Sequence, residues 1–184
     1  MSARLICLLS LACLLAVPAS ASAQLAPDVD EYTLKTAFLF NFTRFVQWPE
    51  SAFEAADSPF RICVVGTDPF GPRLDSLQQR RVGERRIEVD RPSEPAALQR
   101  CQITYLGEDV PDSIRAATIN DEAVQMLTVA SDARFAREGG MIALVTSSGR
   151  VRLHVNLDSL RKSKLQVSAK LLEVAERRIG ETRG

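Results

Sequence analysis

The sequence is poor in the residues from which metal centres and catalytic bases are most often built. Its 184 residues include a single histidine, four cysteines and one tryptophan. It contains no G-x-S-x-G elbow, no P-loop and no G-x-G-x-x-G pattern. These absences argue against a serine hydrolase, a phosphate-loop protein and a His/Cys metal centre, so we expect neither an enzyme nor a bound cofactor.

The sequence also lacks an excess of charge of either sign. Lys and Arg together number 23, and Asp and Glu together number 23, which gives a formal net charge of zero. Binding to nucleic acid or to an anionic membrane depends on a basic excess, so the balance argues against both. Beyond residue 23, no run is long and apolar enough to span a bilayer, which argues against direct membrane insertion.

The first 23 residues have the pattern of a cleavable export signal. Arg4 supplies a positive charge, residues 5–17 are apolar, and Ala-Ser-Ala at 21–23 fits the usual cleavage rule. The apolar run is shorter than the roughly 20 residues that a transmembrane helix needs. We therefore expect a signal peptide at residues 1–23 and a single mature domain at residues 24–184, located outside the cytoplasm.

Cleavage after Ala23 would remove two of the four cysteines and leave Cys63 and Cys101. Disulfides persist in oxidising compartments outside the cytoplasm. A bridge between these two would close a loop of about 39 residues and stabilise the fold by roughly 4 kcal/mol in the chain-entropy picture. Two buried free thiols remain the alternative.

Residues 32–49 (YTLKTAFLFNFTRFVQWP) hold half of the eight phenylalanines and the only tryptophan. Leu34, Phe38, Phe42 and Phe45 recur at spacings of four, four and three, which predicts an amphipathic helix with these side chains facing the core. Asp28 or Asp30 can cap its start. Because the residue before a proline is driven out of the helical region, we expect the helix to end at Pro49.

The rest of the chain alternates between strand and helix patterns. We expect strands at residues 60–65, 86–89, 102–106, 125–129, 141–145 and 151–156, and helical segments at 70–79, 93–100, 111–117, 131–137 and 169–179. Such alternation is typical of an α/β fold. We predict a single-domain three-layer sandwich, with a mostly parallel central sheet flanked by helices. Ser147-Ser148-Gly149 adds a late antiparallel hairpin.

Two capping aspartates and the single histidine complete the local predictions. Asp68 suits the N-cap of the helix at 70–79, with Pro69 at its first position, and Asp158 suits the cap of a later short helix. His154 falls on the polar side of the strand at 151–156, where we expect it to face solvent or an interface.

The turn after residues 60–65 could form a small-ligand crevice at the strand ends. The residues of this candidate crevice are Gly66, Thr67, Asp68 and Phe70.

Four segments, taken in order, resemble the YfiR-type periplasmic proteins. They are residues 32–49, residues 60–71 (FRICVVGTDPFG), residues 139–145 (GGMIALV), and residues 151–172 with N-L-D at 156–158 and S-A-K-L-L at 168–172. The resemblance covers most of the mature chain and implies an α/β domain with helices on both sides of a sheet. The disulfide of that family resembles the Cys63–Cys101 pair. A second cysteine pair present in some members is absent here, which counts against redox sensing through that pair.

The resemblance implies repression of an inner-membrane diguanylate cyclase through the cyclase's periplasmic portion, which lowers cyclic di-GMP and biofilm formation. It also implies an outer-membrane lipoprotein as a counterpart and the possibility of a homodimer. The candidate residues for partner binding lie in and before the last expected helix: Arg161, Lys164, Lys170, Glu173 and Arg177. The alternative function is a periplasmic small-ligand sensor for another signalling receptor.

Overall fold

The structure, a computed structural model, describes residues 30–119 and 125–180. The predicted signal peptide and Asp28 lie outside these ranges. No helix in the described ranges is both long and apolar enough to cross a bilayer.

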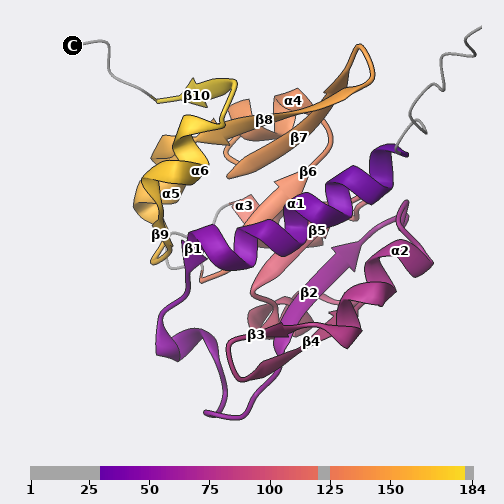
Figure 1. The fold of residues 1–184 in the computed structure, drawn as a ribbon, viewed down its shortest axis with the longest axis vertical. Helices are drawn as coiled ribbons and strands as arrows, with labels where there is room; N and C mark the ends of the chain where they lie inside the picture. Colours follow the sequence, from indigo (N-terminus) through magenta and orange to yellow (C-terminus); the bar gives the residue numbers. More distant parts are fainter. Residues whose placement is uncertain (1–29, 120–124, 181–184) are drawn as a thin grey trace, which may run out of the picture.

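An open sheet of eight strands forms the centre of the fold (Figure 1). The strands stand in the order β10-β8-β7-β6-β5-β2-β4-β3. Their bounds are β2 Phe60–Val65, β3 Arg81–Val82, β4 Arg85–Asp90, β5 Ile103–Leu106, β6 Leu127–Ala130, β7 Ile142–Ser147, β8 Arg150–Asn156 and β10 Arg177–Ile179. Neighbours from β4 through β7 are parallel, whereas β7 and β8 form an antiparallel hairpin. The predicted fold class, with its mostly parallel sheet and late hairpin, is confirmed.

Helices cover the sheet, and a small second sheet lies beside it. The helices are α1 Glu31–Phe45, α2 Pro72–Asp75, α3 Asp112–Ile119, α4 Ala133–Arg137, α5 Leu157–Lys162 and α6 Ala169–Glu173, with short 3-10 turns η1 Glu50–Ala52, η2 Ser76–Gln79 and η3 Pro95–Arg100. The helix α1 crosses one face of the sheet, and α3 and α4 lie behind the other (Figure 1). Strands β1 Val46–Gln47 and β9 Gln166–Val167 pair antiparallel away from the main sheet.

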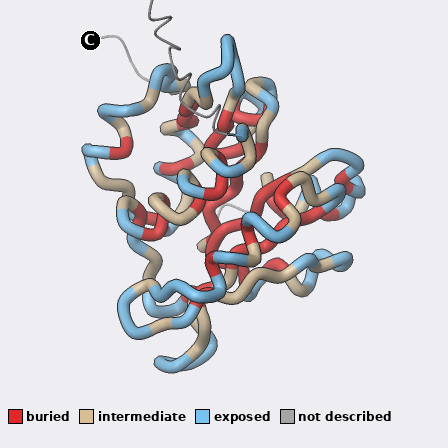
Figure 2. The backbone as a smooth tube through the Cα atoms, turned by 45° about the vertical axis from the view of Figure 1, so that its right-hand side comes forward, coloured by how far each residue is buried: buried red, intermediate tan, exposed pale blue. Residues whose placement is uncertain are grey.

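The central strands are buried on both faces, as their continuous apolar runs require. Every residue of β5 and β6 is buried, and β2 has only Arg61 partly exposed. Figure 2 shows the buried residues running through the strands, with the exposed ones gathered in the connections. Apolar burial of this kind is the main driving force for folding.

The helix α1 buries a different side from the one that its phenylalanine spacing predicts. Asp30 caps it, as expected, by accepting a hydrogen bond from the Thr33 amide at 3.1 Å. Its buried residues are Lys35, Thr36, Leu39, Phe42 and Thr43, so only Phe42 of the predicted stripe is buried.

Leu34, Phe38 and Phe45 are half-buried along one flank of α1, one helical step away from the buried side. The predicted end at Pro49 is also wrong. The helix stops at Phe45 because Val46 and Gln47 leave it to pair with Val167 and Gln166.

The last predicted helix is shorter than expected. Helix α6 ends at Glu173, and Arg177–Ile179 form strand β10 beside β8 instead of a further turn of helix. The parallel partner strand outweighs the helical propensity of this segment.

Two cap predictions also fail. Gly71 occupies the N-cap position of α2, with Pro72 following it, and the Asn156 side chain caps α5 by accepting from the Ser159 amide.

His154 is buried, contrary to the expected solvent or interface position. Only 9% of its surface is exposed, and its Nδ1 has no hydrogen-bond partner among the described residues. It lies directly across from Arg177 in the β8–β10 pairing. The polar side of β8 is buried because α4 packs against it, as the bond from Asn156 Nδ2 to the Ala136 carbonyl shows.

Burial lowers the pKa of His154, and the positive charges of Arg177 and Arg137 lower it further, against an opposing effect of Glu176. In the unfolded chain the pKa returns to its ordinary value near 6.5. Below that pH the unfolded state therefore binds the proton more readily than the folded state, so stability falls as the pH drops through about 6.5.

We predict that His154→Gln flattens the loss of stability between about pH 7 and pH 5. Urea unfolding at several pH values measures this slope. Since the chain has one histidine, a proton NMR titration also reports its pKa without ambiguity. A folded-state pKa at or above the ordinary histidine value would contradict the prediction.

Candidate functional site

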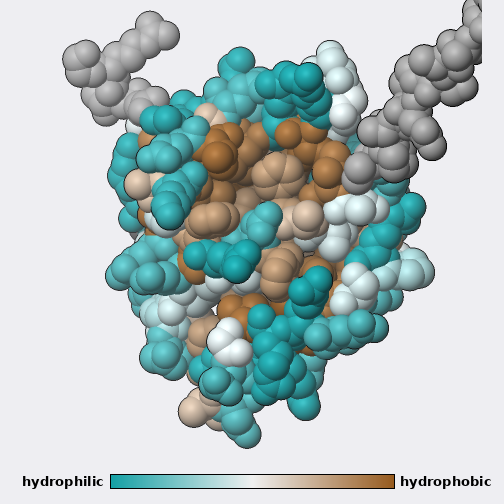
Figure 3. Space-filling view, viewed as in Figure 1, coloured by the Kyte–Doolittle hydropathy of each residue, from teal (hydrophilic) through white to brown (hydrophobic). Residues whose placement is uncertain are grey.

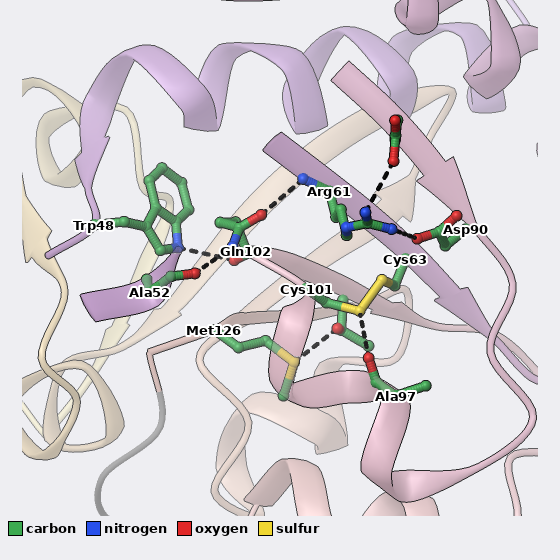
Figure 4. Close-up of a disulfide and its surroundings, with 11 residues drawn as sticks. Trp48, Ala52, Arg61, Cys63, Asp90, Ala97, Cys101, Gln102 and Met126 are labelled. Carbon is green, nitrogen blue, oxygen red and sulfur yellow. Dashed lines mark hydrogen bonds and ion pairs between the residues drawn. A yellow bond between two sulfur atoms is a disulfide. The ribbon is translucent and has the colours of Figure 1, made fainter. Parts of the chain in front are cut away.

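A disulfide joins Cys63 in β2 to Cys101, which lies between η3 and β5 (Figure 4). The two Cα atoms are 5.9 Å apart, and both residues are buried. The bridge therefore ties together two adjacent parallel strands at the centre of the sheet. Of the two alternatives that the sequence leaves open, the bridge is the one present.

Gln102 fixes the chain on either side of this bridge (Figure 4). Its side-chain amide donates to the Ala52 carbonyl at 2.6 Å, and its side-chain oxygen accepts from the Arg61 amide at 2.7 Å. Its backbone carbonyl accepts from the Trp48 indole at 2.9 Å. The segment after α1 is thereby held against β2 and β5, so hydrogen bonds join the segments that surround the disulfide.

A cavity of about 840 Å³ opens at the opposite end of the sheet, where β2, β5 and β6 terminate. We refer to it as the strand-end crevice. From β2 the chain first moves outward to β4 and then returns to β5 on the other side of β2. The crevice therefore lies beside the topological switch point, where open α/β sheets commonly bind ligands.

The sequence predicts a candidate crevice at this edge of the sheet, formed by the residues that follow β2. Thr67 lines the cavity, and its hydroxyl donates to Asp109 at 3.3 Å. Gly66 is packed beside the Glu108 carbonyl. Asp68 accepts from the Phe70 amide and forms an ion pair with Arg91 at 2.7 Å, and the Phe70 ring is fully buried against Tyr105.

The wall of the crevice also uses residues that the sequence analysis did not single out. Ser131 accepts a hydrogen bond from Lys35 Nζ at 2.6 Å, and its oxygen lies 2.5 Å from the Tyr105 hydroxyl. Burial raises the pKa of Tyr105 to about 12, so its hydroxyl stays protonated. The sequence could not identify Lys35 as a buried residue. Buried helix positions are recognised by their apolar side chains, and a lysine with 1% exposure is an exception to that rule.

The positive charge of Lys35 is compensated by groups around it. Its ammonium group pairs with Glu31 one turn earlier on α1, and it lies 5.1 Å from the centre of the Tyr32 ring. The hydrogen bond from Lys35 is the main cause of the lowered pKa of Glu31.

The five candidate partner residues are exposed, but they do not share one helix. Arg161 lies on α5, Lys164 in the following loop, Lys170 and Glu173 on α6, and Arg177 on β10. Arg161 is tied to its own chain through the Asp158 carboxylate and the Gly180 carbonyl. Within residues 30–119 and 125–180, no group of three or more His, Cys, Asp or Glu side chains could hold a metal ion.

An apolar face borders this C-terminal region. Figure 3 shows apolar side chains gathered around a hollow between α1, α6 and the hairpin strands, with polar residues around it. The half-buried apolar residues on these elements include Leu34, Phe38 and Phe45 on α1, Val151 on β8 and Leu172 on α6, and Val174 directly follows α6. Val174 is 65% exposed and is the only large apolar residue in the described ranges that is exposed to solvent.

Comparison with protein-family models matches residues 32–176 to the family described as YfiR/HmsC-like. The matched stretch begins within α1 and ends just before β10. Comparison with curated proteins finds no match.

The disulfide yields a stability prediction. Replacing both Cys63 and Cys101 by alanine should lower the free energy of unfolding by roughly 2–4 kcal/mol, because the unfolded chain regains the freedom that the bridge removes. Urea unfolding of the oxidised protein measures this loss. A reductant should destabilise the unmodified protein in the same direction and leave the double variant unaffected. Equal stability with and without the bridge would refute the prediction.

Proposed function

The chain belongs to the YfiR/HmsC-like family, whose role is periplasmic regulation of cyclic di-GMP signalling, and we propose that it represses an inner-membrane diguanylate cyclase by binding the cyclase's periplasmic portion. The family is regulatory rather than catalytic. The proposal includes export by a signal peptide at residues 1–23 and residence in the periplasm. An outer-membrane lipoprotein that relieves the repression, and a homodimer, belong to the same proposal.

The observation that carries the proposal is the apolar face formed by α1, β8, α6 and Val174 (Figure 3). Protein interfaces combine an apolar centre with a polar rim, whereas isolated exposed apolar residues are common on any surface. Here three elements carry half-buried apolar side chains, and the solvent-exposed Val174 directly follows one of them, α6. Lys170 and Glu173 on the exposed side of α6 would then form part of the rim.

The alternative is a small-ligand sensor serving a different receptor. The strand-end crevice favours it, because its volume lies within the range of small-molecule sites. The two functions are compatible in one chain, since the crevice and the apolar face use different residues.

We predict that Val174→Asp abolishes repression while leaving the fold intact. In the proposed interface the aspartate would replace an exposed apolar side chain by a charge, and desolvating that charge in a complex is costly. In cells the variant should raise cyclic di-GMP to the level found in the deletion strain. The purified variant should retain the melting temperature of the unmodified protein, because Val174 is largely exposed.

Ala56→Asp is the matched control, since it makes the same kind of change at an exposed turn near η1. It should co-purify with the membrane cyclase as the unmodified protein does, whereas Val174→Asp should not. Undiminished co-purification of Val174→Asp would exclude the apolar face as the interface. Unchanged cyclic di-GMP on deletion, with no cyclase co-purifying, would exclude the proposed function itself.

A further inference from the structure

We propose that the strand-end crevice binds a hydroxylated organic cation, of the chemical class of amino sugars and amino alcohols. The inference rests on the volume of the crevice, the charges at its mouth and the hydroxyl groups in its wall. It does not depend on the identity of a protein partner.

The crevice has the size and depth of a small-molecule site. Its volume of about 840 Å³ would be excessive for a single ion but suits an organic molecule. Tyr105, Ala130 and Phe135 are buried residues that form its apolar part. This surface can accept the carbon skeleton of a ligand while the polar groups around it set the ligand's orientation.

The mouth carries an excess of negative charge. Four carboxylates line it, from Glu108, Asp109, Asp132 and Glu138. Asp132 is neutralised by an ion pair with Arg134 at 2.7 Å, which lowers the pKa of Asp132.

Among the described residues, the other three carboxylates form no ion pair, and Arg115 is the remaining cation of the lining. A cleft lined mostly by one sign of charge concentrates ligands of the opposite sign.

The wall supplies a hydrogen-bond donor that has no acceptor. Lys35 can only donate, so Ser131 must accept its bond. The contact between Tyr105 and Ser131 uses one of their two hydroxyl hydrogens, whichever residue is the donor. The second hydroxyl hydrogen has no acceptor among the described residues. Tyr105 is only 2% exposed and Ser131 is half-buried, so a ligand oxygen in the crevice could accept the remaining hydrogen from whichever of the two carries it.

These two features select the ligand class together. The carboxylates at the mouth disfavour an anion. A simple diamine would pair with the carboxylates, but its ammonium groups could not accept the unpaired hydroxyl hydrogen. A neutral sugar could accept this hydrogen, but it would gain no attraction from the negative charge at the mouth. A metal ion is disfavoured because no three ligand groups converge among the described residues. A molecule that carries both an ammonium group and hydroxyl oxygens meets every requirement.

Isothermal titration calorimetry of the purified protein tests this with three probes. Glucosamine has both features, glucose has only the hydroxyl groups, and putrescine has only the ammonium groups. Glucosamine should bind roughly tenfold more tightly than either of the others, because each lacks one set of contacts. Its affinity should fall as salt is added, since the charges at the mouth are exposed.

A double variant tests the location. Glu108→Gln with Glu138→Gln should reduce glucosamine affinity to the level of glucose without changing the melting temperature, because both side chains are exposed. Glu84→Gln with Glu94→Gln makes the same chemical change at exposed positions outside the crevice lining and should leave binding intact.

Ser131→Ala should weaken binding of glucosamine and of glucose alike, since it alters the hydroxyl pair. No glucosamine binding at millimolar concentration, equal affinity for all three probes, or unchanged binding in the crevice double variant would each overturn the proposal.

Discussion

The rest of the structure depends on how α1 lies on the sheet. Leu39 and Phe42 are fully buried on one side of α1, and this side of the helix also carries the ammonium group of Lys35 into the protein. A buried charge is tolerated only when it is paired and hydrogen-bonded. Glu31 supplies the pair and Ser131 the hydrogen bond, so the orientation of the helix is specified by polar contacts as well as by packing.

Much of the sheet was predictable from sequence because its strands obey simple rules. The run FRICVV corresponds to β2 at both of its ends, and Ser148 and Gly149 adopt the positive φ angles of 51° and 70° that a tight hairpin requires. The cysteine pair was predictable from the expected export of the chain. In each case the signal is local or compositional, so no knowledge of a distant partner is needed.

The errors share a physical cause, which is that a distant segment decides the outcome. The side of α1 that is buried is not the one that carries most of the aromatic stripe. Arg177 forms part of a strand, and not of a helix, because it pairs with β8. His154 is buried because α4 covers a strand face that looks polar in sequence. The sequence predicted a crevice from the turn after β2, of which Thr67 lines the strand-end crevice, but the hydroxyl groups of its wall come from β5 and from the residue after β6, which only the folded sheet brings together.

The same helix borders both surfaces to which we assign binding. Tyr32 lines the strand-end crevice, whereas Phe38 and Phe45 belong to the apolar face. The helix is held at its start by the ion pair between Asp30 and Arg73 and at its end by the β1–β9 pairing. A ligand that only fills the crevice therefore has little reason to move it. Coupling between the two surfaces would require a change in the Lys35–Ser131 contact, because that contact joins the buried side of the helix directly to the crevice wall.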